Sequence, residues 1–123
     1  MKENCTIYNT IDIISKKWTL LIILSIHKGT NNTKRYSEIK KDMSGITSKI
    51  LSLRLKELEK EGVINRKIDD IKIPIKVYYS LTDSGKDLLK IIQDIKIWGL
   101  KWKKQSKLTT RICNRTICKD CNI

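Results

Sequence analysis

The sequence predicts a mostly helical α+β domain in which four helices precede two strands and one long helix. The chain has 123 residues, about the size of one ordinary domain. Hydrophobic residues make up 40% of it and charged residues 32%, so it can build a core and we do not expect it to be disordered. The spacing of apolar residues is helical except over residues 63–81, where it alternates.

The start of the chain carries two helices. Ile7 and Ile11 lie four residues apart, on one face of the first helix. The apolar run 20–24 predicts that the second helix is buried. Ser15 is the predicted N-cap of this second helix, which would begin near Lys16.

Two further helices are predicted at residues 36–43 and 48–61, joined by a turn. Gly45 suits the turn, Thr47 is the predicted N-cap of the second helix, and Gly62 ends it. Leucines at helical spacing form a buried stripe there, which leaves a polar, basic outer face. The pair has the dimensions of a helix-turn-helix, whose second helix reads the major groove of a duplex. An ordinary αα-hairpin with a solvated face fits the helix pair alone equally well.

A β-hairpin follows directly. Residues 63–68 and 75–81 are rich in β-branched and aromatic residues with strand alternation. Lys67, Lys72 and Lys76 would make a second basic surface beside the second helix of the pair. Together the two surfaces would bind the phosphates of a duplex while the helix enters the major groove. A helix-turn-helix followed by a hairpin is a winged helix, and this is the fold we predict.

The last predicted helix is long and bears an apolar stripe. It runs from Asp83 to about residue 104, with Thr82 as its N-cap. The stripe has more apolar surface than one small domain covers easily, so we expect a homodimer contact there. The alternative is packing of the stripe on its own domain. A two-fold dimer would present two recognition helices roughly 34 Å apart and prefer an inverted repeat.

Charge and composition narrow the function. There are 26 Lys and Arg residues against 13 Asp and Glu, a net charge of +13, which attracts polyanions such as nucleic acid or an anionic membrane surface. A Lys-rich compositional habit of the source organism is the alternative explanation. We expect a cytoplasmic protein with no membrane partner, because no apolar run is long enough for a span or a secretory signal. The sequence has no Gly-rich phosphate loop and no Ser/His/Asp set, so we do not expect an enzyme.

Cysteines form two groups. Cys5 stands alone, whereas Cys113, Cys118 and Cys121 are close together. The spacing of these three suits zinc or the first ligands of a [2Fe–2S] cluster, with Cys5 or His27 as the fourth ligand. Disulfide exchange with Cys5 and free thiols are the alternatives.

Short motifs in order over residues 5 to 102 resemble the HxlR family of bacterial and archaeal winged-helix regulators. The matching segments are Cys5, Ile11–Ile14, Lys17–Thr19, Arg35–Ile39, Gly45–Thr47, Leu53–Glu59, Gly62–Ile64, Pro74, Val77–Gly85 and Trp98–Gly99. The chain departs from the family pattern at Ser15 and Lys16, where a glycine is usual, and at Tyr78, where an acidic residue is frequent.

The pattern and the resemblance together imply a dimeric regulator that binds double-stranded operator DNA. The expected DNA-binding residues are Arg35, Tyr36, Thr47, Ser48, Lys49, Ser52, Arg54, Lys56, Lys72 and Lys76. The expected dimer contacts are Ile7, Ile11, Ile91, Ile95, Trp98 and Trp102. We assign residues 1–105 to the winged helix-turn-helix domain with its dimerisation helices and residues 106–123 to a cysteine-rich tail.

The resemblance also implies sensing through an N-terminal cysteine, here Cys5. Lys16 and Lys17 would favour its thiolate if the first helix folds back on the second. Oxidation, or alkylation by a thiol-reactive small molecule, would then move the dimer interface. An inert cysteine, sensing through a metal or iron–sulfur site in the tail, and a winged helix that binds only proteins are the alternatives.

Overall fold

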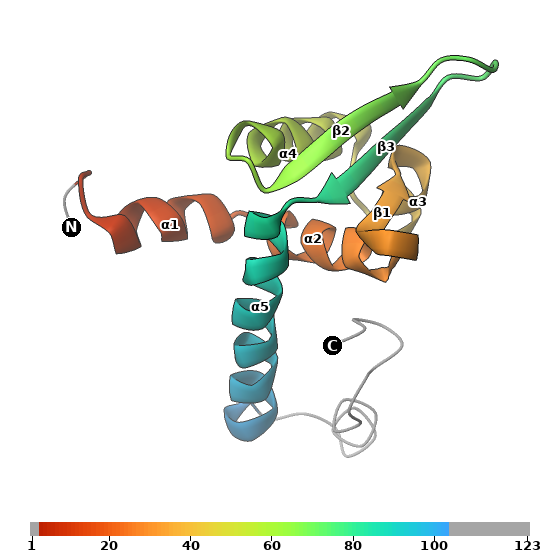
Figure 1. Ribbon diagram of the computed structural model, residues 1–123. Coiled ribbons are helices and arrows are strands. Elements are labelled where there is room, and N and C mark those ends of the chain that lie inside the picture. The colour runs from red at the N-terminus through yellow and green to blue at the C-terminus, as the bar shows by residue number, and fades with distance from the viewer. Residues whose placement is uncertain (1–2, 104–123) are drawn as a thin grey trace.

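The computed structural model describes residues 3–103 and confirms the predicted winged helix (Figure 1). In chain order, the elements are α1 (Thr6–Ile14), α2 (Thr19–Lys28), the 3-10 turn η1 (Thr30–Asn32), β1 (Thr33–Arg35), α3 (Tyr36–Asp42), α4 (Ser48–Lys60), β2 (Ile64–Asp69), β3 (Lys76–Leu81) and α5 (Asp83–Trp102). Helices α3 and α4 form the helix-turn-helix, β2 and β3 form the wing, and α5 is the long helix that the sequence predicts.

The sheet has three antiparallel strands in the order β1-β3-β2. The hairpin register pairs Arg66 with Tyr79 and Lys67 with Tyr78, so that these two pairs lie on opposite faces of the sheet. Strand β1 was not predicted. It has three residues, too few for an alternating pattern, and it pairs with β3, more than 40 residues later in the chain.

The core lies between the helices and one face of the sheet. Helix α2 buries three isoleucines, and the leucine stripe of α4 is buried as its spacing predicts. The inner sheet face completes the core with Ile64, Tyr79 and Leu81. The fully buried large side chains are Ile22, Ile23, Ile26, Ile39, Leu51, Leu55, Leu58 and Ile64.

The predicted cap of the second helix was wrong. Ser15 instead ends α1, where its backbone N–H donates to the Ile11 carbonyl at 2.8 Å. Helix α2 begins at Thr19, after Trp18 takes a left-handed conformation with φ 84°. Trp18 is half-buried against the core, and this packing compensates for the unfavourable backbone conformation.

The other predicted caps are confirmed. Thr47 Oγ1 accepts from the Ile50 N–H and Thr82 Oγ1 from the Gly85 N–H, each at 3.2 Å. Gly45, in the turn between α3 and α4, has φ +88°, a backbone conformation that favours glycine. The Thr47 cap and the Gly45 turn together fix where the recognition helix starts.

Helices α1 and α5 project from the body of the domain (Figure 1). Helix α1 has no buried residue, and α5 buries only Gly85 and Ile92 among its 20 residues. Within residues 3–103, no helix has both the length and the apolar character that a membrane span requires.

Candidate DNA-binding surface and thiol site

Side chains of α3 hold the first turn of α4. Lys40 Nζ donates to Ser48 Oγ at 2.7 Å. Tyr36 Oη donates to the Ser48 carbonyl and shares a hydrogen bond with Ser52 Oγ, both at 3.3 Å. Because these bonds connect the two helices, α4 presents its N-terminal turn in a fixed orientation.

Most of the predicted DNA-binding residues on α4 are accessible. Thr47, Ser48, Lys49 and Lys56 are exposed, while Ser52 is half-buried under Tyr36. Lysine and serine side chains at the start of a groove-reading helix can reach phosphates and base edges. This face of α4 therefore has the chemistry for a duplex.

Arg54 lies elsewhere, and the structure does not place it with these residues. Its Nε donates to the Lys17 carbonyl at 3.3 Å, and its guanidinium lies 3.3 Å from Glu57 Oε1. The side chain is only 17% exposed. Arg54 thus connects α4 to the turn between α1 and α2, because it lies on the flank of the helix that faces this turn.

A groove of about 460 Å³ separates α4 from the wing. Its lining residues are Tyr36, Ser52, Lys56, Glu59, Arg66, Val77 and Tyr79. Arg66 was missed as a candidate, although it alternates with the buried Ile64 and therefore shares the sheet face on which α4 packs. Lys40 was also missed, although it lies one turn after Tyr36 on the same side of α3.

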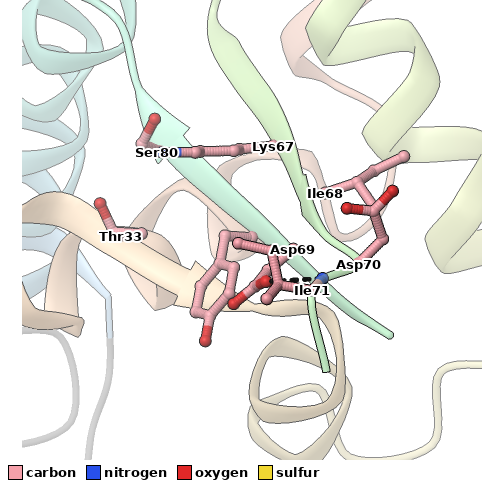
Figure 2. Close-up of a pocket in the computed structure, with 8 residues that line it drawn as sticks. Thr33, Lys67, Ile68, Asp69, Asp70, Ile71 and Ser80 are labelled. Carbon is pink, nitrogen blue, oxygen red and sulfur yellow. Dashed lines mark hydrogen bonds between the residues drawn. The ribbon is translucent and has the colours of Figure 1, made fainter. Parts of the chain in front are cut away.

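The other face of the wing carries further predicted residues. Arg35 pairs with Tyr78, and Lys76 pairs with Asp69, so both lie on the outer face with Lys67. A shallow pocket of about 550 Å³ on this face is lined by Thr33, Lys67, Ile68, Asp69, Asp70, Ile71, Tyr78 and Ser80. Figure 2 shows the Lys67 side chain lying across β3 toward Ser80. The predicted basic residues are thus divided between two faces of the hairpin, with Lys72 in the loop that joins its strands.

The position of the helix-turn-helix on the core depends on Asp42, the last residue of α3. The buried Ser25 hydroxyl donates to Asp42 Oδ2 at 2.7 Å, and Lys34 forms an ion pair with the same oxygen. Burial alone would raise the pKa of Asp42, but hydrogen bonds from Lys34 and Ser25 and the charges of Lys34 and Lys28 hold it below its usual 3.8. The ionised carboxylate therefore stabilises the folded protein.

Replacing this carboxylate by an amide should destabilise the protein. We expect Asp42→Asn to lower the free energy of unfolding by about 1–3 kcal/mol at neutral pH, since Lys34 keeps only a tenth of its side chain exposed and loses its charged partner. A carboxylate with a lowered folded pKa stabilises above its unfolded pKa, and this effect is lost as the pH falls through the folded value. In urea titrations from pH 7 to pH 2, the difference between the wild type and Asp42→Asn should shrink below about pH 4. A constant difference would contradict the ion-pair assignment. Asp12→Asn, on the exposed surface of α1, is the control.

The predicted dimer residues form an uncovered apolar surface on α1 and α5. Trp98 and Trp102 are 61% and 65% exposed, and the isoleucines along the two helices are about half exposed. The members of this surface are Ile7, Ile11, Ile91, Ile95, Trp98 and Trp102. Large exposed apolar surfaces are typical of interaction sites, and the dimer contact at these residues stays a prediction.

Cys5 lies at the start of α1, and its surroundings differ from the prediction. It is a half-buried free thiol at the N-cap position. The condition for activation by Lys16 and Lys17, a first helix that folds back on the second, is not met, because α1 extends away from α2 (Figure 1). Cys5 precedes α1, whereas Lys16 and Lys17 follow its other end. An exposed turn at Ser15 joins the two helices and directs α1 outward.

The predicted tail site lies beyond the structurally described part of the chain. Cys113, Cys118 and Cys121 fall outside residues 3–103. Within those residues, no three His, Cys, Asp or Glu side chains gather in a way that could hold a metal ion.

The braced helix-turn-helix, its basic face and the adjacent wing define a winged helix-turn-helix DNA-binding protein. A sequence profile described as HxlR-like helix-turn-helix matches residues 13–107. The chain belongs to this family of transcriptional regulators, which is not a family of enzymes.

Several individual proteins are similar to this chain in sequence or in structure. It is 40% identical over 92 residues to the uncharacterised HTH-type transcriptional regulator YvaP of Bacillus subtilis, a match that covers 75% of this chain and 82% of that protein. The reduced transcriptional regulator YodB from B. subtilis superposes with a TM-score of 0.70 at 31% identity, over 81% of this chain and 95% of that one. YodB is also known in diamide-treated and quinone-bound forms. The redox regulator HypR in its oxidised form superposes with a TM-score of 0.67 at 33% identity, over 82% of this chain and all of that one.

Proposed function

We propose that the protein is a homodimeric regulator that binds an inverted repeat in double-stranded DNA and that thiol chemistry at Cys5 controls this binding. One observation carries the proposal: exposed lysines of α4 lie beside the wing, with Lys56 and Arg66 lining one groove, on a domain whose α1 and α5 keep large apolar side chains exposed. The α4 helices of two protomers would enter successive major grooves. The wings would hold the flanking phosphates.

The redox part of the proposal has two supports. One is the likeness to the redox regulator HypR, known in an oxidised form, and to YodB, known in diamide-treated and quinone-bound forms. The other is the position of Cys5 at the start of a helix that carries proposed dimer contacts. A thiol modified there alters the end of the α1 surface against which the partner would pack.

A physical link connects α1 to the recognition helix. Lys16 Nζ lies 3.4 Å from Glu57 Oε1, and Arg54 donates to the Lys17 carbonyl. Both contacts join α4 to the turn that follows α1. A shift of α1 would therefore be transmitted to α4 and change the separation of the two recognition helices.

DNA binding can be tested even though the operator sequence is unknown. The reduced protein is used to select duplexes from a random pool, and the enriched sequence (below, the selected duplex) is titrated by fluorescence anisotropy against a scrambled duplex. We expect an inverted repeat that binds two protomers, at least about 1,000-fold tighter than the scrambled sequence. Failure to enrich any sequence would overturn the proposal and favour a winged helix that binds proteins.

The role of Cys5 is tested by the same titration with diamide and glutathione, which together convert an accessible thiol to its mixed disulfide with glutathione while diamide takes up the two electrons and two protons. We expect diamide to change the affinity of the wild type for the selected duplex by about tenfold, a usual size for coupling between two sites. Cys5→Ser should bind like the reduced wild type and not respond to diamide. The matched control changes Cys113, Cys118 and Cys121 together to serine, and should keep the response. If Cys5→Ser keeps the response and the triple variant loses it, the sensing site lies in the tail and not at Cys5.

A further inference from the structure

The tip of the wing is apolar, although it is highly exposed. Ile71 and Ile73 are 90% and 95% exposed, and Ile75 is 62% exposed. Surface loops ordinarily carry polar turn residues, because nothing offsets the hydration cost of large aliphatic side chains there. Several such side chains on one short loop indicate a partner that covers them.

The fold presents this tip outward. Strands β2 and β3 carry the loop beyond the helices of the domain (Figure 1). The Ile71 N–H donates to Asp69 Oδ1 at 3.3 Å, which shapes the start of the turn (Figure 2). The isoleucines therefore stand at the end of an ordered hairpin and away from the core of their own domain.

We propose that the wing tip is an apolar wedge that enters the minor groove of the bound duplex, partly unstacks a base step and bends the DNA. This inference rests on the proposed function. Side chains such as isoleucine and proline, inserted between base steps from the minor groove, kink a duplex by roughly 20–90°. Ile71, Ile73 and Pro74 supply such side chains at the wing tip.

Charge and shape both favour a duplex as the occupant. Lys72 lies among the isoleucines, and Lys67 and Lys76 lie on the two strands that lead to the tip. Asp69, which faces Lys76 across the strands, and Asp70 offset part of this charge, and residues 67–76 keep a net charge of +1. In B-DNA the minor groove is about 6 Å wide between its phosphates. The strands of a hairpin are about 4.8 Å apart, so only the tip of the loop can enter, with lysines left at the phosphate edges. Lys56 of α4 and Arg66 of the wing line the same groove, so one duplex can contact both elements.

The test measures DNA bending with the full chain. The selected duplex carries a donor and an acceptor fluorophore at its two ends and 2-aminopurine at the steps beside the major-groove sites. We expect the wild type to raise energy transfer between the ends and to brighten the 2-aminopurine. Ile71→Ser/Ile73→Ser should remove both signals and weaken binding about tenfold or more, since burial of one exposed isoleucine is worth about that factor. Its sequence preference should remain.

Lys72→Ala is the matched control in the same loop. It should lower the slope of log affinity against log salt by about one and keep the bend. Both variants change exposed side chains only, so circular dichroism and urea unfolding should match the wild type.

The possible results distinguish failure of the proposed wedge from failure of the proposed DNA-binding function. A selected duplex that stays straight with the wild type, or bends equally with Ile71→Ser/Ile73→Ser, overturns the wedge and leaves the regulator. A change only in oligomeric state would assign the isoleucines to a protein contact and also overturn the wedge. If no duplex is selected, the proposed function fails and the wedge fails with it.

Discussion

Ile95→Glu/Trp98→Glu should convert the protein to a monomer and lower its affinity for the selected duplex by about 100-fold or more. Both side chains lie on the apolar stripe of α5, and Trp98 is 61% exposed in the protomer. In a dimer, four carboxylates would be placed in a desolvated interface with no cationic partner assigned to them. A monomer loses the effective concentration that links two half-sites, which is worth about 10²–10⁴ in affinity.

Sedimentation velocity and anisotropy measure the two parts of this prediction. The control, Lys86→Gln/Gln93→Glu, makes the same charge change on exposed residues of the opposite face of α5 and should remain dimeric. Circular dichroism should show that the winged domain remains folded in both variants, because neither removes a core side chain. A dimer that survives Ile95→Glu/Trp98→Glu would move the interface away from α5.

Features that depend on local periodicity could be predicted from the sequence. The leucine stripe of α4, the caps Thr47 and Thr82 and the alternating hairpin each depend on neighbours within a few residues, and the structure confirms them. The same information marks the apolar stripe of α5, because helical spacing identifies a face without showing what covers it.

Features that depend on contacts between residues distant in the sequence could not be predicted from it. Strand β1 exists because its three residues pair with β3, and the turn at Trp18 exists because its ring packs on the core. Arg54 was grouped with the DNA-facing residues because it is basic and lies on α4. The Arg54 guanidinium turns toward the segment between α1 and α2, and this is visible only once the fold places the Lys17 carbonyl beside it. The wing-tip isoleucines are exposed because the hairpin carries their loop beyond the helices, and the local sequence does not show this.

Lys49→Ala and Arg54→Ala should therefore fail in different ways, although both remove a cation from α4. Lys49 is exposed in the first turn and makes no ion pair within residues 3–103. Its loss should weaken binding to the selected duplex by about 1–3 kcal/mol if it reads a base, with no change in the free energy of unfolding. Arg54→Ala instead removes the bonds to Lys17 and Glu57 and should cost about 1–2 kcal/mol of stability.

Urea unfolding and paired anisotropy titrations distinguish the two roles. After Lys49→Ala, the preference for the selected over the scrambled duplex should fall. After Arg54→Ala, that preference should remain, because its guanidinium faces Lys17 and Glu57 rather than the duplex. Loss of preference at wild-type stability in Arg54→Ala would show that the guanidinium leaves Glu57 for the DNA. The link between α4 and α1 would then break on binding, and the proposed path from Cys5 to the recognition helix would have to run through Lys16 and Glu57 alone.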